Sequence, residues 1–352
     1  MRRLRHTPVL TLFLSCSLLP AGAAQAQAPR VGTIDFYGLR AVSQEAVRSA
    51  LSLAEGDPRP SEAERAAIER RLKEIPGVLE ARFSAVCCEH GRLSVYVGIA
   101  EDSTAFLELR PPPGSAVTLP RVIFASDADF QRALVKAIRA GNAGDDFSQG
   151  HSLMSDPAVR AVQERFLVYA SRDLDILREV LRTSSDPDQR AFAAQVIAYA
   201  PDKRTVIDDL VYAVGDPDSG VRNNAARALA GFASFANLHP ELKLSIPPTP
   251  FVKMLNSLSW SDRNKGAAVL LALTQGRDPA VLGQLREQAL EALVEMARWR
   301  GPHGAFAYWL LGRVAGRPDE EVVTKWRSRD RERFIEAAIE SIRADSTGSE
   351  VQ

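Results

Sequence analysis

The sequence predicts a mostly helical protein in two parts: a small α+β domain near the N-terminus, followed by an all-α solenoid of stacked helix pairs. Two observations lead to this prediction. Residues 30–101 contain strand and helix patterns in the order β-α-α-β-β. After residue 125 alanine is frequent and aromatic residues are sparse, and an Asp-Pro dipeptide recurs at a spacing of 30 residues.

The first 26 residues predict a cleaved signal peptide. Arginines precede the short apolar run "PVLTLFLSCSLLP", and small residues follow it in "AGAAQAQA", with cleavage expected after Ala26. The run is too short to span a bilayer, and we expect no membrane-spanning helix elsewhere in the chain. The mature protein is therefore expected to be exported, in a bacterium to the periplasm.

Export would change the charge and the thiol content. The full sequence has 44 Lys and Arg against 44 Asp and Glu; the signal peptide holds three arginines and no acid, which leaves 41 basic and 44 acidic residues, a net charge of −3. This balance gives no electrostatic reason to expect binding to nucleic acid or to an anionic membrane. Cys16 would leave with the signal peptide, so Cys87 and Cys88 would be the only thiols of the mature chain.

Residues 30–101 predict a small sheet covered on one side by two helices. "VGTIDFYG" begins with a strand, and "QEAVRSALSL" and "EAERAAIERRLKEI" place apolar residues at helical spacing. Ser61 and Glu64 form a capping box for the second helix. In "RLSVYVGI" apolar and other residues alternate, which predicts a strand with one face in the core.

These residues resemble a POTRA domain, a periplasmic module found before outer-membrane barrels and in some division proteins. The resemblance rests on "IDFYG", "VRSALSLAEGD", "IERRLKEIPGVLEARF" and "LSVYVGIAE" as a set. It implies contact with other proteins, often by addition of a partner strand to the sheet edge, and no catalysis. A single copy without a following barrel argues against a role in barrel insertion. The alternative is a domain with the same element order and no POTRA function.

Cys87 and Cys88 are adjacent at the turn of the predicted hairpin, in "VCCEHG". Consecutive Cα atoms are about 3.8 Å apart, below the usual disulfide range of about 4.4–6.8 Å, so a bond between them requires a distorted peptide. Three interpretations stay open: separate structural cysteines, a vicinal disulfide that stiffens the hairpin, or a redox or metal site with His90. A thiol-redox or redox-sensing protein is therefore the first alternative function.

Residues 102–155 predict a proline-rich linker, one helix and a polar loop. The loop "NAGDDFSQGHSLMSD" contains Asp145, Asp146, His151 and Ser152, for which a metal site or a Ser-His arrangement is conceivable. We favour a solvated loop, because no third ligand has a matching spacing and no nucleophile motif surrounds Ser152. A metal-dependent enzyme on a helical-repeat scaffold is the second alternative function.

Three Asp-Pro dipeptides each predict the start of a helix, because Asp accepts hydrogen bonds from free backbone N–H groups and Pro fits the first helical position. An arginine and an Ala-rich helix follow each dipeptide. These are Asp156-Pro157 with Arg160, Asp186-Pro187 with Arg190, and Asp216-Pro217 with Arg222, the last arginine lying two residues late. Residues 156–343 thus predict roughly four to six helix pairs, and residues 344–352 a disordered tail.

The pattern "DP...VR..A..AL" resembles HEAT repeats, including their short bacterial form. The resemblance implies a right-handed solenoid whose concave surface binds other proteins. Related helical-repeat proteins include a lyase acting on bilin-bearing proteins and a di-iron hydroxylase with repeated His-Glu pairs, but no His-Glu dipeptide occurs here. We therefore expect a scaffold or adaptor without enzymatic activity or cofactor.

The candidate partner-binding residues form a polar strip on neighbouring repeats. For the repeated Asp and Arg we favour helix capping and hydrogen bonds between repeats, with partner binding as the alternative. Trp260 lies near a helix end among polar residues, and Trp is enriched at interface centres. The candidate set is Arg222, Asn223, Asn224, Trp260, Asp262, Arg263, Asn264 and Lys265. The expected partners are proteins, envelope proteins among them.

Overall fold

The computed structural model describes residues 29–89, 91–101, 107–328 and 330–348, and its N-terminal part is a three-stranded sheet with two helices. The sheet order is β1-β3-β2, with β1 parallel and β2 antiparallel to β3. The predicted β-α-α-β-β order is confirmed. The elements are β1 (Arg30–Tyr37), α1 (Gln44–Leu51), α2 (Glu62–Lys73), β2 (Val78–Glu89) and β3 (Arg92–Glu101).

Serine caps fix where α1 and α2 begin. Ser43 Oγ accepts a hydrogen bond from the Ala46 N–H at 3.2 Å. Ser61 Oγ accepts one from the Glu64 N–H, and the Glu64 carboxylate accepts one from the Ser61 N–H, so the predicted capping box is confirmed. The two helices cover one face of the sheet with a small apolar core that includes Val47, Leu51, Ile68, Leu72, Val95, Val97 and Ile99.

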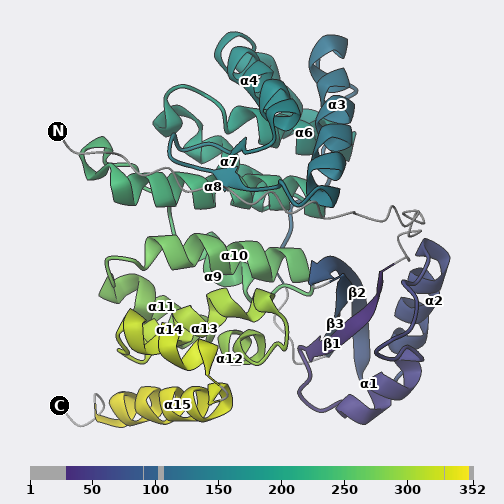
Figure 1. The fold of residues 1–352 in the computed structure, drawn as a ribbon, viewed down its shortest axis with the longest axis vertical. Helices are drawn as coiled ribbons and strands as arrows, with labels where there is room; N and C mark the ends of the chain where they lie inside the picture. The colour runs from purple at the N-terminus through teal and green to yellow at the C-terminus, as the bar shows by residue number, and fades with distance from the viewer. Residues whose placement is uncertain (1–28, 90, 102–106, 329, 349–352) are drawn as a thin grey trace, which may run out of the picture.

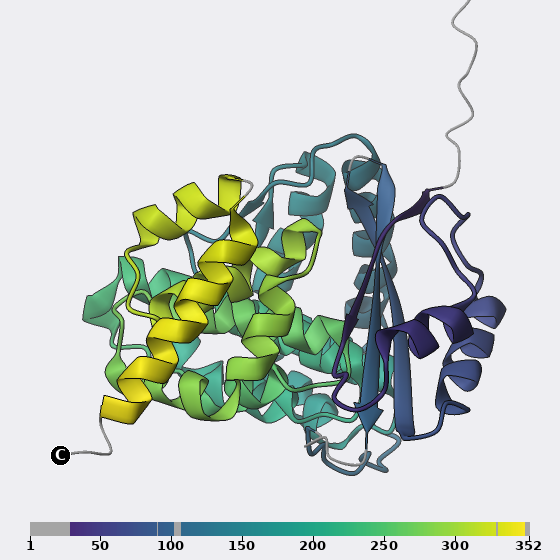
Figure 2. The ribbon, with the colours of Figure 1, turned by 90° about the horizontal axis from the view of Figure 1, so that it is seen from below.

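The two helices cover one face of the sheet, as predicted, and the second face is covered as well, by the helical array, which the sequence did not predict. Figure 2 shows the sheet between α1 and α2 on one side and the helical array on the other. Tyr96 of β3 stacks on Trp260 with ring centroids 5.3 Å apart and lies 4.8 Å from the ring of Trp299. Tyr37 of β1 donates a 2.7 Å hydrogen bond to the Leu258 carbonyl. Tyr37 and Tyr96 thus belong to the core of the array, whereas Val95, Val97 and Ile99 belong to the small core on the other face.

Polar contacts surround this aromatic junction. Arg300 donates from its backbone N–H and side chain to Asp35 and to the Ile34 carbonyl of β1. Arg40 pairs with Glu291 at 3.0 Å and with Glu295 at 2.7 Å. Burial at the junction raises the pKa of the Asp35 carboxyl, although Arg300 opposes the shift. The N-terminal domain and the array are therefore packed into one body through a mixed apolar and charged contact.

Gly98 lies where the sheet and the array are in close contact, so a side chain there should disturb the junction. A Cβ at this position would lie 2.6 Å from the Leu258 carbonyl oxygen and 2.7 Å from the Tyr37 ring. We expect Gly98→Leu to lower the free energy of unfolding by about 1–3 kcal/mol, because a backbone carbonyl cannot move away from an added side chain. Urea denaturation measures the loss. Gly114→Leu is the matched control, since nothing lies within 4 Å of a Cβ there; an equal loss in both variants would contradict the expectation.

The rest of the chain is an array of helices (Figure 1). The helical stretch after Asp278 is divided at Ala289, whose φ of −142° is not helical, into α11 and α12. The predicted disordered tail at 344–352 is wrong for its first residues, because α15 extends to Gly348. Residues 349–352 lie outside the described residues. The helices are α3 (Arg121–Arg139), α4 (Pro157–Arg172), α5 (Leu174–Thr183), α6 (Pro187–Ile197), α7 (Ile207–Val214), α8 (Ser219–Leu238), α9 (Thr249–Met254), α10 (Trp260–Leu273), α11 (Pro279–Gln288), α12 (Leu290–Ala297), α13 (Ala305–Val314), α14 (Asp319–Arg327) and α15 (Arg331–Gly348), with 3₁₀ turns at Lys203–Val206, Pro240–Leu242 and Pro302–Gly304.

The helices pair and stack as predicted for a solenoid. α5 packs on α6, α7 on α8 and α9 on α10, while α6, α8, α10 and α13 pack on one another in a row. Alanines allow this close approach: Ala193, Ala225, Ala226 and Ala267 are fully buried. Each pair buries its apolar face against its neighbours, so the array has one continuous core.

The repeated Asp and Arg residues cap helices and join neighbouring repeats. Asp156 and Asp186 accept backbone hydrogen bonds at the starts of α4 and α6, as predicted. At α8 the prediction is wrong, because Asp218 is the cap, while Asp216 is buried and pairs with Arg190 through two 2.9 Å contacts. The cap lies two residues later than Asp216, which explains why Arg222 lies two residues late.

The predicted proline-rich linker runs along the array rather than through solvent. The Arg110 N–H donates to the Gly215 carbonyl, and Ser115 exchanges backbone hydrogen bonds with Thr183 and Ser185. The Arg110 guanidinium lies 3.2 Å from the centre of the Tyr212 ring. Residues 107–119 thus form an extended strap that lies along the array and leads to its first helix.

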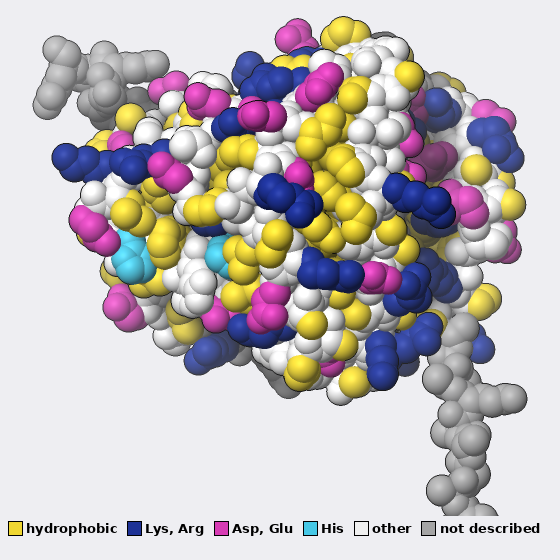
Figure 3. Space-filling model, turned by 90° about the horizontal axis from the view of Figure 1, so that it is seen from above, with side chains coloured by type: hydrophobic (Ala, Val, Ile, Leu, Met, Phe, Trp, Pro, Cys, Tyr) yellow, Lys and Arg dark blue, Asp and Glu magenta, His cyan; other side chains and the backbone are white. Residues whose placement is uncertain are grey.

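The first helices of the array leave apolar side chains exposed. Val122 and Ile138 of α3 are 62% and 56% exposed, and Val168 of α4 is 54% exposed. Figure 3, which views the molecule from above Figure 1, shows hydrophobic side chains on this face among Lys, Arg, Asp and Glu. Within the described residues, no helix combines the length and the apolar character that crossing a membrane requires.

Candidate partner-binding groove

One face of α8 carries the polar side chains that remain accessible after the repeats have stacked. Asn224, Arg227 and Ser234 lie in one row along the helix, which passes through the buried Gly231 between the last two, at spacings of three or four residues. Arg222, on another side of the same helix, is buried in the ion pairs between repeats. The helix therefore uses one side for stacking and another for an accessible surface.

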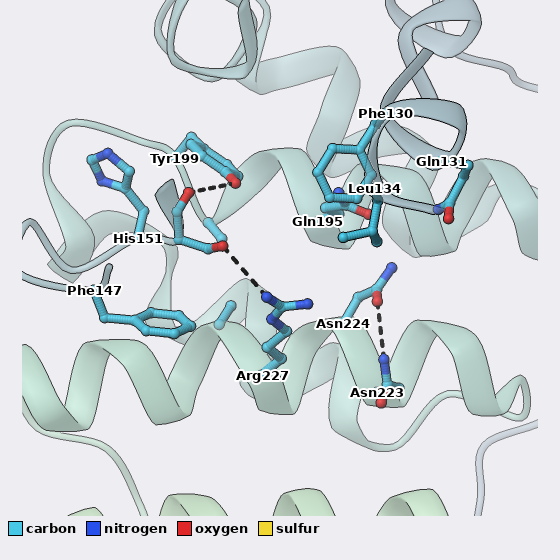
Figure 4. A pocket seen from close by; sticks show the side chains of 13 residues that line it. Phe130, Gln131, Leu134, Phe147, His151, Gln195, Tyr199, Asn223, Asn224 and Arg227 are labelled. Carbon is cyan, nitrogen blue, oxygen red and sulfur yellow. Dashed lines mark hydrogen bonds between the residues drawn. The ribbon is translucent and has the colours of Figure 1, made fainter. Parts of the chain in front are cut away.

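Two hollows lie along this row. The first, of about 230 Å³, lies between α3, α6 and α8 and has Phe130, Leu134 and Gln195 among its lining residues. Figure 4 shows Asn224 and Arg227 reaching from α8 toward Leu134 and Gln195. The second hollow, of about 520 Å³, lies between α8, α10 and α13 and is lined by Ser234, Lys265, Leu271 and Phe306, among others. We call the two hollows together the α8 groove.

The polar loop between α3 and α4 separates the two hollows. It forms a short hairpin of β4 (Asp145–Asp146) and β5 (Leu153–Met154). Phe147, at its tip, lines both hollows. The predicted solvated loop is therefore partly wrong: its tip is exposed, whereas its second half is buried in the array.

A hydrogen-bond network holds the buried half of this loop. Ser152 Oγ donates to Asp145 Oδ1 at 2.6 Å and accepts from Gln163 Nε2 at 3.0 Å. The Tyr199 hydroxyl donates to the Ser152 carbonyl at 2.8 Å. Arg227 pairs with the second oxygen of Asp145. The loop is thus fixed to α4, to the turn that follows α6 and to α8 by side chains that the sequence separates widely.

His151 and Lys203 form a second contact beneath the loop. Lys203 Nζ lies 3.1 Å from His151 Nδ1 and donates to the carbonyls of Ala198 and Ala200. Burial, and then the nearby Lys203 charge, lower the pKa of His151 to about 4, although the Gln149 backbone and Asp146 oppose the shift. Burial also lowers the pKa of Lys203 to about 8.

This pair predicts sensitivity to acid. Between pH 6.5 and about 4 the unfolded chain binds a proton at His151 that the folded chain does not, so the free energy of unfolding falls as the pH falls through this range. His151→Gln should reduce this dependence. Thermal unfolding of both proteins from pH 7 to pH 4 measures it; identical pH profiles would contradict the assignment to His151.

The predicted partner-binding residues divide into two groups. Asp262 is fully buried, and Arg222, Arg263 and Asn264 are nearly so, so these four cannot present side chains to a partner, and that part of the prediction is corrected. Three of the four are engaged in the buried ion pairs Arg222–Asp262 at 2.8 Å and Arg263–Glu295 at 3.1 Å.

The other predicted residues lie at accessible positions or at the junction. Asn223 and Asn224 line the first hollow and Lys265 lines the second. Trp260 is stacked under Tyr96 of the sheet, so it serves the contact between the two parts of the chain. The sequence reasoning missed Arg227, Phe147 and Gly231. A glycine inside an Ala-rich helix was the available signal, because such a position often marks a close approach.

Cys87 lies at the end of β2 and is disulfide-bonded. The structure does not describe the side chains of Cys16 and Cys88, and His90 lies outside the described residues, so the vicinal pairing stays a prediction. Mass spectrometry of unreduced and reduced protein tests it through the thiol count.

The described residues bear on the metal site and the Ser-His arrangement considered for the polar loop. They contain no group of three or more His, Cys, Asp or Glu residues that could hold a metal ion. The hydrogen bonds of Ser152 go to Asp145 and Gln163, while His151 faces Lys203. A Ser-His arrangement for nucleophilic catalysis is therefore not formed by these residues.

Comparison with known proteins supports the repeat assignment. A family described as HEAT repeats matches residues 174–239. This segment runs from α5 to the end of α8, so the HEAT-repeat prediction is confirmed there. No match was found among curated proteins.

Two designed armadillo repeat proteins and an engineered protein are among the solved structures with some similarity. A designed armadillo repeat protein in complex with the peptide (KR)4 is 16% identical, with a TM-score of 0.36, and the match covers 56% of this chain and 98% of that one. A second designed armadillo repeat protein has 16% identity, a TM-score of 0.35 and the same coverage. An engineered protein is 20% identical with a TM-score of 0.35, covering 53% of this chain and 91% of that one.

Proposed function

We propose that this chain is a non-enzymatic scaffold of the bacterial periplasm that binds protein partners through the α8 groove. The observation that carries the proposal is the groove itself, where Asn223, Asn224, Arg227 and Lys265 lie beside apolar side chains on a rigid stack of helices. Apolar pockets with a few convergent polar groups are typical of binding sites. HEAT repeats, which match part of this array, generally serve protein interaction.

The N-terminal domain contributes in a different way. Both faces of its sheet are occupied, and at the outer edge of β1 Val31 exchanges backbone hydrogen bonds with Gly56 and Asp57, so the outer edge of β2 is the better place for addition of a partner strand, as the POTRA resemblance implies. Glu69 of α2 accepts a 2.8 Å hydrogen bond from the Phe83 N–H at this strand. A partner strand would need to displace that carboxylate, so we assign the groove as the main binding surface and the sheet as a support for the array.

Site-specific photo-crosslinking in the envelope fraction tests the proposal. A photo-reactive amino acid at Asn223 should give a discrete crosslinked species, because this position lines the first hollow. The same amino acid at Asp208, an exposed residue of α7 on the other layer of helices, should not. No crosslink at Asn223, or the same crosslinked species from both positions, would reject the groove as the binding surface.

Export is tested separately. Protein purified from the periplasmic fraction should have the mass of residues 27–352, as cleavage after Ala26 predicts. Recovery of the uncleaved chain from the cytoplasm would contradict the periplasmic part of the proposal and leave the binding part to the crosslinking result.

A further inference from the structure

The tip of the loop between α3 and α4 places one acidic and one aromatic side chain on α8. Asp145 pairs with Arg227. Two residues on, the Phe147 ring lies against Gly231, where a Cβ would be 2.7 Å from the ring. α8 therefore provides a cationic hydrogen-bond donor for a carboxylate, Arg227, and space for a ring at Gly231, at the spacing of an acid and an aromatic residue two positions apart.

The space for the Phe147 ring exists because α8 has a glycine at position 231. Gly231 lies in the interior of α8, a helix of 20 residues, where glycine is less favourable than alanine. The neighbouring inner positions of the helix, such as Ala228 and Ala230, are alanines. Only glycine leaves room for the ring, so the composition of α8 accommodates an aromatic side chain at this point.

The α8 groove contains more positive charge than the Asp145 carboxylate of the loop can neutralise. Lys265 of α10 and Arg227 lie close enough for the Arg227 charge to lower the pKa of Lys265, after burial as the larger cause, while Asp145 opposes the shift. Asp145 is the single acidic residue among the described side chains that line the second hollow. Arg227 and Lys265 thus lie beside one carboxylate, while Arg313, the third cation of this hollow, is paired with Asp319, so the groove favours an anionic partner over a cationic one.

Arg227 also keeps hydrogen-bonding capacity for a ligand. Its contacts with Asp145 and Ser152 both use Nη2. Among the described residues, Nε and Nη1 of Arg227 have no acceptor, and Figure 4 shows the guanidinium facing the first hollow. A second carboxylate or a peptide carbonyl can therefore bind there.

The side chains of Asp145 and Phe147 can move out of the α8 groove while the rest of the loop stays folded. Residues 141–149 are exposed except for Phe147, which is half-buried, and the Asp145 side chain, which is 18% exposed in its pair with Arg227; His151, Leu153 and Met154 are buried and anchor the hairpin. Rotation of Phe147 away from Gly231 would join the two hollows. The joined groove follows α8 from Asn223 to Ser234, a length of about 16 Å at 1.5 Å per residue, enough for about five residues of extended chain.

We propose that Asp145 and Phe147 occupy the groove as an internal substitute for its partner, which is an extended protein segment with an acidic residue two positions before an aromatic residue. The proposal rests on the proposed function and adds the chemistry of the partner. It also makes the loop a competitor: a partner segment must displace both side chains to bind.

A peptide of residues 143–149, Ala-Gly-Asp-Asp-Phe-Ser-Gln, is the probe. Fluorescence anisotropy should show that it binds Asp145→Asn/Phe147→Ala at least about tenfold more tightly than the unchanged protein, because the internal occupant no longer competes. A peptide with alanine in place of the first Asp and the Phe should bind neither protein. Asp146→Asn is the matched control for the loss of a carboxylate, since the Asp146 side chain accepts from the Ser148 N–H within the loop.

Adding Arg227→Met to the double variant should abolish peptide binding, with circular dichroism confirming that each variant is folded. Equal affinity of the peptide for the double variant and the unchanged protein, or equal binding of the alanine peptide, would overturn the proposal. These results differ from failure of the proposed function. If Asn223 still crosslinks a partner but the double variant gains no affinity for the peptide, the groove binds proteins and the loop is not its competitor.

Discussion

Replacing Asp262 with alanine is expected to lower the free energy of unfolding by about 3–5 kcal/mol, because it leaves a buried guanidinium without its carboxylate. Asp262 is fully buried and accepts three hydrogen bonds from Arg222, at 2.8–3.1 Å, and one from Ser257. Arg222 would keep only the carbonyls of Asp216 and Pro217. Urea denaturation followed by circular dichroism measures the loss.

Asp129→Ala is the control for this prediction. Asp129 pairs with Arg132 and Arg165 at the surface, where water screens the charges and competes for the hydrogen bonds. We expect its replacement to leave the free energy of unfolding nearly unchanged. Equal losses in the two variants would show that the Arg222–Asp262 pair does not join the repeats as its burial indicates.

The repeated dipeptides explain why much of the array could be predicted. Capping by Asp and the placement of Pro at the first helical turn are local, so Asp156 and Asp186 predict the starts of α4 and α6 directly. Asp216 shows the limit of the local pattern. Its carboxylate serves Arg190 from the preceding repeat, and that contact exists only after the repeats have stacked.

The junction between the sheet and the array could not be predicted, because it depends on residues far apart in the sequence. Tyr37 and Tyr96 have the alternation of an ordinary strand, and Trp299 has the pattern of a core residue in a helix pair. The sequence does not indicate that these rings meet. The strap shows the same limit, since the proline-rich segment excludes a helix but does not specify what the extended chain lies against.

The repeat pattern predicted some residues of the α8 groove and missed others. Asn223, Asn224 and Lys265 follow the repeated arginines and were found by their position in the repeat. Arg227 and Phe147 lie on different elements, and they meet only because the loop after α3 folds back over α8. Repeat patterns predict which helix faces stack, but they do not predict which segment from outside the repeats will cover the remaining face.

Replacing Trp299 with alanine is expected to lower the free energy of unfolding by about 3–5 kcal/mol, because it leaves a large cavity in the junction. Trp299 is 1% exposed, and its ring lies 5.7 Å from that of Tyr37 and 4.8 Å from that of Tyr96. The loss should appear in urea denaturation. The strap at residues 107–119 should also become more sensitive to protease, since it joins the two parts that Trp299 holds together.

Trp299→Phe distinguishes packing from hydrogen bonding at this position. The indole N–H of Trp299 is buried and has no hydrogen-bond partner among the described residues, so phenylalanine loses ring area and no polar contact. The loss should therefore be clearly smaller than for alanine. A loss below about 1 kcal/mol for Trp299→Ala would contradict the junction as a tightly packed interface. Because both parts of the chain bury rings around Trp299, a weakened junction should also free the sheet face that carries Tyr37 and Tyr96.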